Sequence, residues 1–484
     1  MTSALSSVTK SPIHMRSLIL LATLCSTLAA AQKPNILFVL IDDMGAVDYA
    51  AAGSKLYDTP HIDQLAKEGV TFNHAYSSHP RCLPSRYSIF SGRIPGRDGV
   101  PGFQDRKASK HALPLERVTW GEILRDNGYS TGYIGKWHLG KDGGEPDKQG
   151  FTDSRIANAA GAPPSYFYPY HVARQGSSKE QFMLIDGEKD EYLTDRLTAE
   201  ALDFIDKNKD QPFALVLAHY AVHTPIEAPE AETKAYKKKL KSMNLPIGTG
   251  RKDQDIVTVG NGSTKTLQNH PTYAAMVTSV DASLGQLRSK LAELKLDQNT
   301  LIIFTSDHGG LSTRSKDNNR ELATSNLPFR CGKGWLYEGG IRVPHIVSWP
   351  GTIQPANSNT QTLGADHYPT ILELTGCKLP ENLAIDGISY APALRGISTT
   401  RPPLFFHSPL GRPTQTGDHP ASAIIQNQWK LFEHHISGKL ELYDLSKDPG
   451  ETTNLAAQEP EKLQSLHALL KANKATLGTK QRSH

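Results

Sequence analysis

Cysteine and net charge are both scarce in this chain. Only 4 cysteines occur among 484 residues, and their spacing matches no zinc-binding pattern. The formal net charge is +4, which neither requires a nucleic-acid partner nor excludes a polyanionic substrate. The sequence also lacks a helix-turn-helix pattern and a stripe of basic and aromatic residues. We therefore expect no nucleic-acid binding.

Long apolar runs are lacking except near the N-terminus. A basic segment ending at Arg16 precedes an apolar run from Leu18 to Ala31, whose last residues are small, as at a signal-peptidase site. The run is shorter than the roughly 20 residues that a membrane-spanning helix needs. We interpret residues 1–31 as a signal peptide, with an uncleaved anchor as the alternative and Met15 as an alternative start to Met1. The protein is expected to be periplasmic or secreted, with no stable membrane span.

The few cysteines have different expected fates. Cys25 would leave with the signal peptide, and Cys82 belongs to a distinctive motif. Cys331 and Cys377 remain, and an exported protein can pair two such residues. The sequence does not give their separation, so a disulfide between them stays open.

The apolar pattern after residue 31 is typical of the α/β class. Asn35–Ile41 is a continuous apolar run, as in a strand buried on both faces. Apolar residues recur at helical spacing from Tyr273 to Leu294. Further strands are expected at residues 129–134, 213–219, 301–304 and 343–349. These patterns predict a catalytic domain over residues 32–395, with a large mixed, mostly parallel sheet flanked by helices.

Two parts of the chain depart from this pattern. Residues 231–271 are polar and Lys-rich, and we expect an irregular surface insertion at the rim of the substrate site. Beyond Leu394, short strands are expected at residues 404–406, 423–425, 429–432 and 440–443, before a helix at about 459–477. Residues 396–484 are therefore predicted to form a smaller α+β subdomain with an antiparallel sheet.

Acidic residues follow two of the predicted strands. Asp42 and Asp43 come directly after the first strand, and Asp307 and His308 follow the strand at residues 301–304. The carboxyl ends of parallel strands meet at one edge of a sheet, where α/β proteins place their active sites. Acids gathered there can hold a divalent cation, and oxygen ligands favour calcium or magnesium. Solvated loop acids are the alternative interpretation.

The segment 81–93 combines a cysteine with signals for the start and end of a helix. Pro84 suits a first helical turn, and Gly92 suits a helix end. We expect Cys82 where a loop enters a short helix, beside unpaired backbone N–H groups that favour an anion. A buried structural cysteine is the alternative.

The sequence Cys82-Leu83-Pro84-Ser85-Arg86, with Gly92-Arg93 downstream, resembles the signature of the type I sulfatases. Further segments occur in the order of that family: Asp42-Asp43, Gly135–Gly140, His223–Pro225, Ser306–Gly309, Gly332–Gly334, Glu338–Pro344 and Leu442–Leu445. The resemblance covers nearly the whole chain after residue 31. It implies an alkaline-phosphatase-like core, one calcium ion in preference to magnesium, and a cysteine oxidised to formylglycine (3-oxoalanine), whose hydrate is the nucleophile.

The resemblance also implies a role for each matched residue. The implied cation ligands are Asp42, Asp43, modified Cys82, Asp307 and His308. The implied catalytic residues are Cys82, Arg86, which holds the hydrate, Lys136, His223 and Lys333, which bind sulfate oxygens, and His138, which contacts the second hydroxyl. His138 is the candidate base, and His223 or Lys333 is the candidate acid. His308 departs from the asparagine of many sulfatases, and imidazole is an unusual ligand for a hard cation.

These roles predict hydrolysis of a sulfate monoester, with a sulfated carbohydrate as the expected substrate and a formylglycine-generating or sulfatase-maturating enzyme as a partner. A dication and two lysines would offset the negative charge that repels a nucleophile from sulfate. Two alternatives remain: a phosphonate or phosphate ester hydrolase of the same superfamily, and a catalytically silent glycan-binding protein. The outer pocket is expected to involve His79, Arg81, residues 164–174, the Lys-rich insertion, His407 and Arg412.

Overall fold

The computed structural model describes residues 33–100, 112–170, 186–259 and 262–478. The expected signal peptide, residues 1–31, and residues 171–174 of the expected outer pocket lie outside this part of the chain. None of the helices in the described part has the length and apolar character needed to span a membrane.

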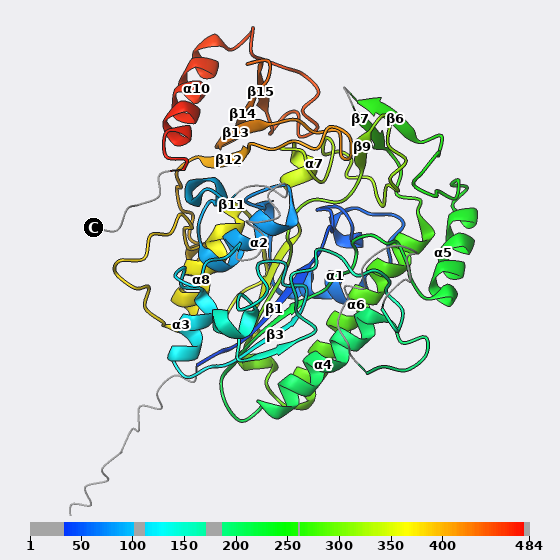
Figure 1. Cartoon of the computed structure of the whole chain (residues 1–484), viewed down its shortest axis with the longest axis vertical. Helices are drawn as coiled ribbons and strands as arrows, with labels where there is room; N and C mark the ends of the chain where they lie inside the picture. The colour runs from blue at the N-terminus through cyan, green and yellow to red at the C-terminus, as the bar shows by residue number, and fades with distance from the viewer. Residues whose placement is uncertain (1–32, 101–111, 171–185, 260–261, 479–484) are drawn as a thin grey trace, which may run out of the picture. The chain divides into compact units, whose positions relative to one another are not determined.

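A sheet of eight strands is the centre of the fold (Figure 1). In order across the sheet, its strands are β11 (Ala356–Leu363), β2 (Val70–Tyr76), β10 (His345–Ser348), β8 (Thr300–Ser306), β1 (Asn35–Ile41), β5 (Phe213–Ala218), β3 (Ser130–Gly135) and β4 (Asp153–Arg155). β10 runs antiparallel to β8 and β2, whereas the other neighbouring pairs are parallel. The predicted mixed, mostly parallel sheet is confirmed.

β1 is buried on both faces, as its continuous apolar run predicts. Leu37, Val39 and Ile41 pack in one core with α1 (Pro60–Glu68), α4 (Leu193–Lys207) and α6 (Pro271–Glu293). Ile36, Phe38 and Leu40 pack in a second core with α2 (Cys82–Ser91), α3 (Trp120–Asp126) and α8 (His367–Thr375). Figure 1 shows α4 and α6 on one side of the sheet and α2, α3 and α8 on the other.

A second, antiparallel sheet lies in the C-terminal part, as predicted (Figure 1). Its strands are β12 (Leu404–Ser408), β13 (Ala421–Gln426), β14 (Trp429–His434) and β15 (Leu440–Asp444), and α10 (Pro460–Lys474) packs against it. The described residues from Lys33 onward form one compact unit, so the domain boundary at residue 396 stays a prediction.

A buried ion network joins this second sheet to the helix α7 (Glu338–Ile341). Lys430 Nζ, on β14, lies 3.0 Å from Glu338 Oε1 and 2.7 Å from Glu451 Oε1. Arg342 Nε donates to Glu338 Oε2 at 3.0 Å. Burial raises the pKa of Glu451 to about 7, although Lys430 opposes the change. The network thus connects Glu338 and Arg342, in the matched segment Glu338–Pro344, to Lys430 and Glu451 in the C-terminal part.

The expectation of an irregular insertion at residues 231–271 is wrong. The segment contains α5 (Glu230–Ser242) and the hairpin of β6 (Ile256–Val259) and β7 (Gly262–Lys265), and β7 also pairs with β9 (Thr313–Ser315). The many polar residues conceal the helix because α5 buries only Tyr236 and Leu240. Acids in its first turn and lysines in its last turn suit the helix dipole.

The open question of a disulfide is answered by the structure. Cys331 and Cys377 are both buried, and both are free thiols in the described part of the chain.

Candidate active site

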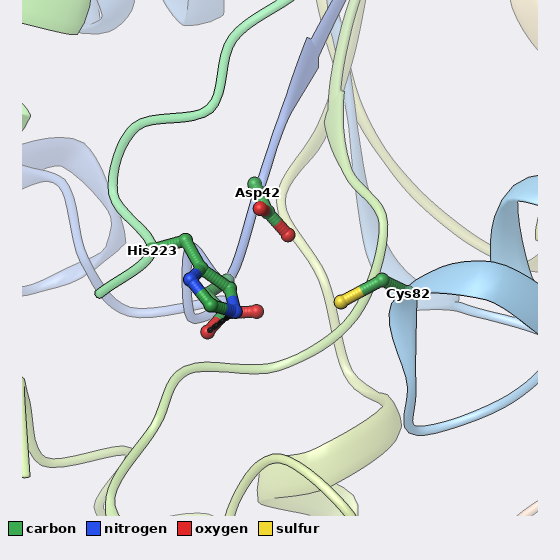
Figure 2. Close-up of side chains that lie close together, drawn as sticks. Asp42, Cys82 and His223 are labelled. Atoms are coloured by element: carbon green, nitrogen blue, oxygen red, sulfur yellow. Dashed lines mark ion pairs between the residues drawn. The ribbon is translucent and has the colours of Figure 1, made fainter. Parts of the chain in front are cut away.

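Four neighbouring parallel strands deliver polar residues to one edge of the large sheet. Asp42 follows β1, Asp307 follows β8, and Lys136 follows β3. His223 lies in the loop after β5, and Figure 2 shows its side chain near those of Asp42 and Cys82. The strand order β8-β1-β5-β3 places all four carboxyl ends side by side. The predicted gathering of site residues at this edge is therefore observed.

Cys82 reaches the same edge from the opposite direction, as the first residue of α2. Arg81 is the N-cap, and Gly92 closes the helix with φ 68°, donating its N–H to the Ser88 carbonyl at 2.9 Å. Both helix signals in the sequence are confirmed, and every residue of α2 is buried. The Cys82 Sγ atom stands where the oxygens of a formylglycine hydrate would lie.

Two of the three acids are paired with lysines. Lys136 Nζ lies 2.5 Å from Asp42 Oδ2, and Lys333 Nζ lies 2.7 Å from both carboxylate oxygens of Asp43. All four side chains are almost completely buried. Buried charges are tolerated only when they are paired in this way.

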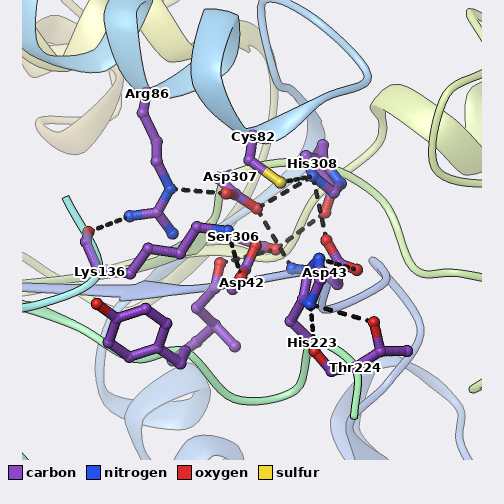
Figure 3. Close-up of polar contacts among 12 residues, drawn as sticks. Asp42, Asp43, Cys82, Arg86, Lys136, His223, Thr224, Ser306, Asp307 and His308 are labelled. Carbon is purple, nitrogen blue, oxygen red and sulfur yellow. Dashed lines mark hydrogen bonds and ion pairs between the residues drawn. The ribbon is translucent and has the colours of Figure 1, made fainter. Parts of the chain in front are cut away.

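The third acid, Asp307, is held by Arg86 (Figure 3). Arg86 Nε donates to Asp307 Oδ2 at 2.9 Å, and Arg86 Nη1 donates to the Lys136 carbonyl at 2.6 Å. The Ser85 hydroxyl donates to the Asp307 backbone carbonyl. Arg86 therefore ties α2 to the loops that follow β8 and β3.

Asp42 lies in a buried position that disfavours its charged form. Burial raises the pKa of Asp42 well above its usual range, despite Lys136, and the nearby Asp307, Cys82 and Asp43 act in the same direction. Asp42 Oδ1 is buried and has no hydrogen-bond partner in the described residues. Such an atom is an available ligand for a cation.

The donor atoms fit a metal ion in type and position. Ligand atoms of Asp42, Cys82, Asp307 and His308 lie within 4.8 Å of one another. His308 Nδ1 donates to the Gly309 carbonyl at 3.0 Å, so Nε2 is the ring nitrogen that faces the cluster. Burial lowers the pKa of His308, but Asp307, Cys82 and Asp43 outweigh burial and raise it, so a bound cation would replace a proton on Nε2. That Nε2 lies 3.1 Å from Asp43 Oδ1 and 3.2 Å from Cys82 Sγ. The imidazole at position 308 is thus oriented as a ligand would be.

The environment of Cys82 favours a negative charge. Burial alone would raise the pKa of its thiol, but Lys136, Lys333 and His308 outweigh burial and hold it well below the usual range. The site is therefore suited to an anionic group at this position.

The two other histidines are held neutral. Burial, with Lys136 and Arg86 nearby, lowers the pKa of His138 to about 4. Burial, with Lys333, lowers the pKa of His223 to about 3. His223 Nδ1 donates to the Thr224 carbonyl at 2.7 Å, so its Nε2 carries a lone pair and lies 3.8 Å from Asp43 Oδ2.

A cavity of about 510 Å³ opens over this cluster. Its lining residues are Arg81, Cys82, His138, Gly161, Ala162, His223, Asn318, Arg320, Lys333, Arg412 and Gln415. Arg81 and Arg412 were expected there, whereas His79 is buried and His407 bonds to Ser422 on β13. No described residue of the Lys-rich insertion lines the cavity.

Several lining residues have no motif that would identify them. Gly161 lies where a Cβ would come within 2.8 Å of His138 Nε2, so the absence of a side chain lets its loop approach the histidine. Asn318, Arg320 and Gln415 lie on loops after β9 and β12. The only feature of the sequence that could have indicated a role in the cavity is the position of these residues on loops near a matched motif.

Comparison with known proteins decides the family. The sulfatase family model matches residues 34–377. The chain belongs to the sulfatase family. A second model, the C-terminal region of N-sulphoglucosamine sulphohydrolase, matches residues 331–479.

Named relatives agree with this assignment. The sulfatase is 30% identical to N-acetylgalactosamine-6-sulfatase of Sus scrofa, over 93% of this chain and 87% of the relative. It is 31% identical to arylsulfatase A of Homo sapiens, over 93% of this chain and 89% of the relative. Such relatives are sulfuric ester hydrolases, and membership implies a divalent metal and a formylglycine residue.

Solved structures extend the likeness to the whole fold. Ps i-CgsB, solved in complex with k-i-k-neocarrahexaose, has a TM-score of 0.74 and 28% identity, covering 93% of this chain and 94% of its own. The sulfatase PsFucS1 from Pseudoalteromonas sp. has a TM-score of 0.69 and 26% identity, covering 94% and 92%. The alkaline-phosphatase-like fold implied by the sequence is therefore confirmed.

The electrostatics of the site predict how an unmodified Cys82 would react. In protein made without maturation machinery and treated with a chelator, the rate at which iodoacetamide labels Cys82 should rise with pH much less than for an ordinary thiol between about pH 6 and pH 8, because neighbouring cations hold its pKa well below the usual range. Cys331 is the internal control, since burial raises its pKa to about 12 and it should stay unlabelled in the folded protein. Peptide mapping over time measures both rates. Labelling of Cys82 that rises about tenfold per pH unit, as for an ordinary thiol, would contradict this description of the site.

Proposed function

We propose that this sulfatase is an exported, formylglycine-dependent enzyme that hydrolyses sulfate monoesters on a carbohydrate. One observation carries the proposal: the cysteine of the sulfatase signature lies in a buried cluster with Asp42, Asp43 and Asp307 and within reach of two lysines. The printed names of the relatives support a sugar substrate, since one is an N-acetylgalactosamine-6-sulfatase and one neighbour binds a hexaose.

We further propose calcium as the resident cation. The ligands would be Asp42, Asp43, the modified Cys82, Asp307 and His308. Carboxylate oxygens dominate this set, which favours a hard cation, and the flexible coordination of calcium tolerates one imidazole better than magnesium does. When bound, the cation supplies positive charge that offsets the charges of sulfate and nucleophile.

The chain's own side chains divide the remaining work. Arg86 orients the hydrate of residue 82 and keeps Asp307 in place. Lys136 and Lys333 present ammonium groups to the sulfate oxygens in a site with little water, where charge stabilisation is strong. The hydrate can release the sulfate that it has accepted and is then free for the next substrate. An ordinary serine would keep the sulfate as a stable ester.

Proton transfer is assigned to the groups around the cavity. His138 has a pKa of about 4 and is neutral at neutral pH, which suits it to accept a proton as the base. His223 is also neutral. It can act as an acid only if the negative charge of the bound substrate raises its pKa enough for Nε2 to be protonated. Lys333 is the alternative donor to the leaving alcohol.

Two further parts of the proposal concern the enzyme's biosynthesis. The apolar run before residue 32 supports export to the periplasm or the medium. The motif Cys82–Arg86 supports recognition by a formylglycine-generating or sulfatase-maturating enzyme before folding, because all of its residues are buried in the folded chain.

Sulfate release tests the proposed reaction. Matured protein should release sulfate from an aryl sulfate and from sulfated glycans, and Cys82→Ala should lower the rate at least about 1000-fold because the nucleophile is lost. Cys377→Ala, which changes a buried thiol outside the site, is the matched control and should retain the rate. Faster turnover of an aryl phosphodiester or phosphonate monoester than of the aryl sulfate would favour the alternative hydrolase. No turnover of any ester, together with an unmodified Cys82 in protein from the natural host, would favour the glycan-binding alternative.

Thermal unfolding tests the proposed cation. After chelation, calcium at about 100 times its Kd should add about 2.7 kcal/mol to the free energy of unfolding. Magnesium should stabilise less at equal concentration. Asp43→Asn should reduce the gain because a ligand is lost, whereas Asp147→Asn, at an exposed position, should keep it. An equal calcium effect in Asp43→Asn and wild type would show that the cation binds elsewhere.

A further inference from the structure

The outer wall of the cavity is positively charged, and none of the described residues that line it is acidic. Three arginines line it together with two neutral polar residues: Arg81, Arg320, Arg412, Asn318 and Gln415. None of them belongs to the cluster of cation ligands and lysines beneath. The wall therefore has a charge that the proposed chemistry at Cys82 does not use.

Two loops from different parts of the chain build this wall. Residues 316–320 follow β9, and residues 409–420 connect β12 to β13 in the C-terminal sheet. The Ser315 N–H donates to the Gln415 carbonyl at 2.8 Å, and Asn318 Nδ2 donates to the Thr414 carbonyl at 2.8 Å. Trp335 Nε1 donates to the Thr416 carbonyl at 2.8 Å. These bonds fix the loops, so the wall is preformed.

The three arginines differ in how their charge is balanced. Arg81 lies 2.5 Å from Asp418 and donates to the Leu410 carbonyl at 2.6 Å, so its charge serves the structure. Arg320 has no carboxylate within 4.0 Å in the described part of the chain, and it is only partly buried. Its guanidinium is available to a ligand.

Arg412 lines the cavity with both of these arginines, and its backbone N–H donates to Asp418 Oδ2 at 3.4 Å. Its Nη1 donates to Gln415 Oε1 at 3.4 Å. Burial, then Arg81, and to a smaller extent Arg320 lower the pKa of Arg412 to about 10, while the charge of Cys82 opposes them. Arg412 is thus close enough to both Arg320 and residue 82 for their charges to change its pKa. An anion placed here would relieve the repulsion between arginines.

We propose that Arg320 and Arg412 form a second anion subsite, which selects substrates bearing another sulfate or a carboxylate near the sulfate that is cleaved. The inference rests on the proposed sulfatase reaction and defines its substrate class more narrowly. A planar guanidinium pair suits both oxyanions, because each can accept two parallel N–H bonds. The subsite lies beyond the cluster that would hold the cleaved group, so the two anions are bound by different residues.

Comparison of three substrates tests the subsite in matured enzyme. They are a monosulfated neutral disaccharide, the same disaccharide with a second sulfate, and a monosulfated disaccharide containing a uronate. Arg320→Gln and Arg412→Gln should each lower kcat/KM on a dianionic substrate about tenfold to 100-fold, mainly through KM, and at least about tenfold more than on the monosulfated one. The dianionic substrate with the larger loss identifies the second group as sulfate or carboxylate.

Arg395→Gln is the matched control, because Arg395 pairs with Glu373 on an exposed surface outside the cavity. It should leave all three rates as in wild type. Equal losses on all three substrates in the Arg320 and Arg412 variants would overturn the proposal, as would no loss on either dianionic substrate.

A binding measurement keeps the subsite testable if turnover fails. Cys82→Ala protein should bind the preferred dianionic disaccharide about tenfold or more tightly than the monosulfated one by calorimetry, and Arg412→Gln in that background should remove the preference. Absence of sulfate release with this preference intact would contradict the proposed reaction alone. Equal affinities for all three sugars would contradict the subsite alone.

Discussion

The burial of three carboxylates around one point is the constraint on which the rest of the site depends. Asp42, Asp43 and Asp307 all follow strands whose carboxyl ends lie side by side, and all are shielded from water. Carboxylates placed in this way repel one another. Desolvation further raises the free energy of keeping them ionised in the folded protein. The fold answers with cations from three other elements: Lys136 after β3, Arg86 on α2 and Lys333 from the loop before α7. Burial still raises the pKa of Asp42, and its Oδ1 atom has no hydrogen-bond partner in the described residues, which is the physical reason to expect a cation there.

The same constraint explains the neighbouring histidines and the outer wall. Burial, together with the positive groups that neutralise the acids, holds His138 and His223 unprotonated at neutral pH. Further out, Arg320 and Arg412 extend positive charge along the cavity, on loops joined by backbone hydrogen bonds. The cations paired with the buried acids stabilise the protein. The arginines of the outer wall extend this positive charge to a place where it can select a substrate.

The parts of the fold that the sequence predicted well are those with strong local patterns. Asn35–Ile41 is a strand with the predicted bounds, and the helical spacing of apolar residues from Tyr273 to Leu294 corresponds to α6 (Pro271–Glu293). β2 and β11 gave no clear signal, because β2 mixes buried apolar residues with Asn73 and His74, and β11 is a mostly polar edge strand. α5 was missed for the related reason that most of its surface faces water.

The site shows the same division between local pattern and long-range contact. Motif residues such as Asp42, Cys82 and Lys333 were identifiable because their spacing resembles that of a family. Arg320 and Gln415 were not, since only tertiary hydrogen bonds between distant loops bring them to one wall. The orientation of the His308 ring could not be predicted from the sequence either, because it depends on the hydrogen bond from Nδ1 to the Gly309 carbonyl.

The most direct test of the central claim is the chemical state of residue 82 in active enzyme. Protein purified from its natural host should be digested with trypsin, and the peptide Cys82–Arg86 analysed by mass spectrometry. We expect the aldehyde of formylglycine in place of the thiol, in proportion to the specific activity of each preparation. Full sulfatase activity with an unmodified thiol at Cys82 would contradict a formylglycine nucleophile in this cluster.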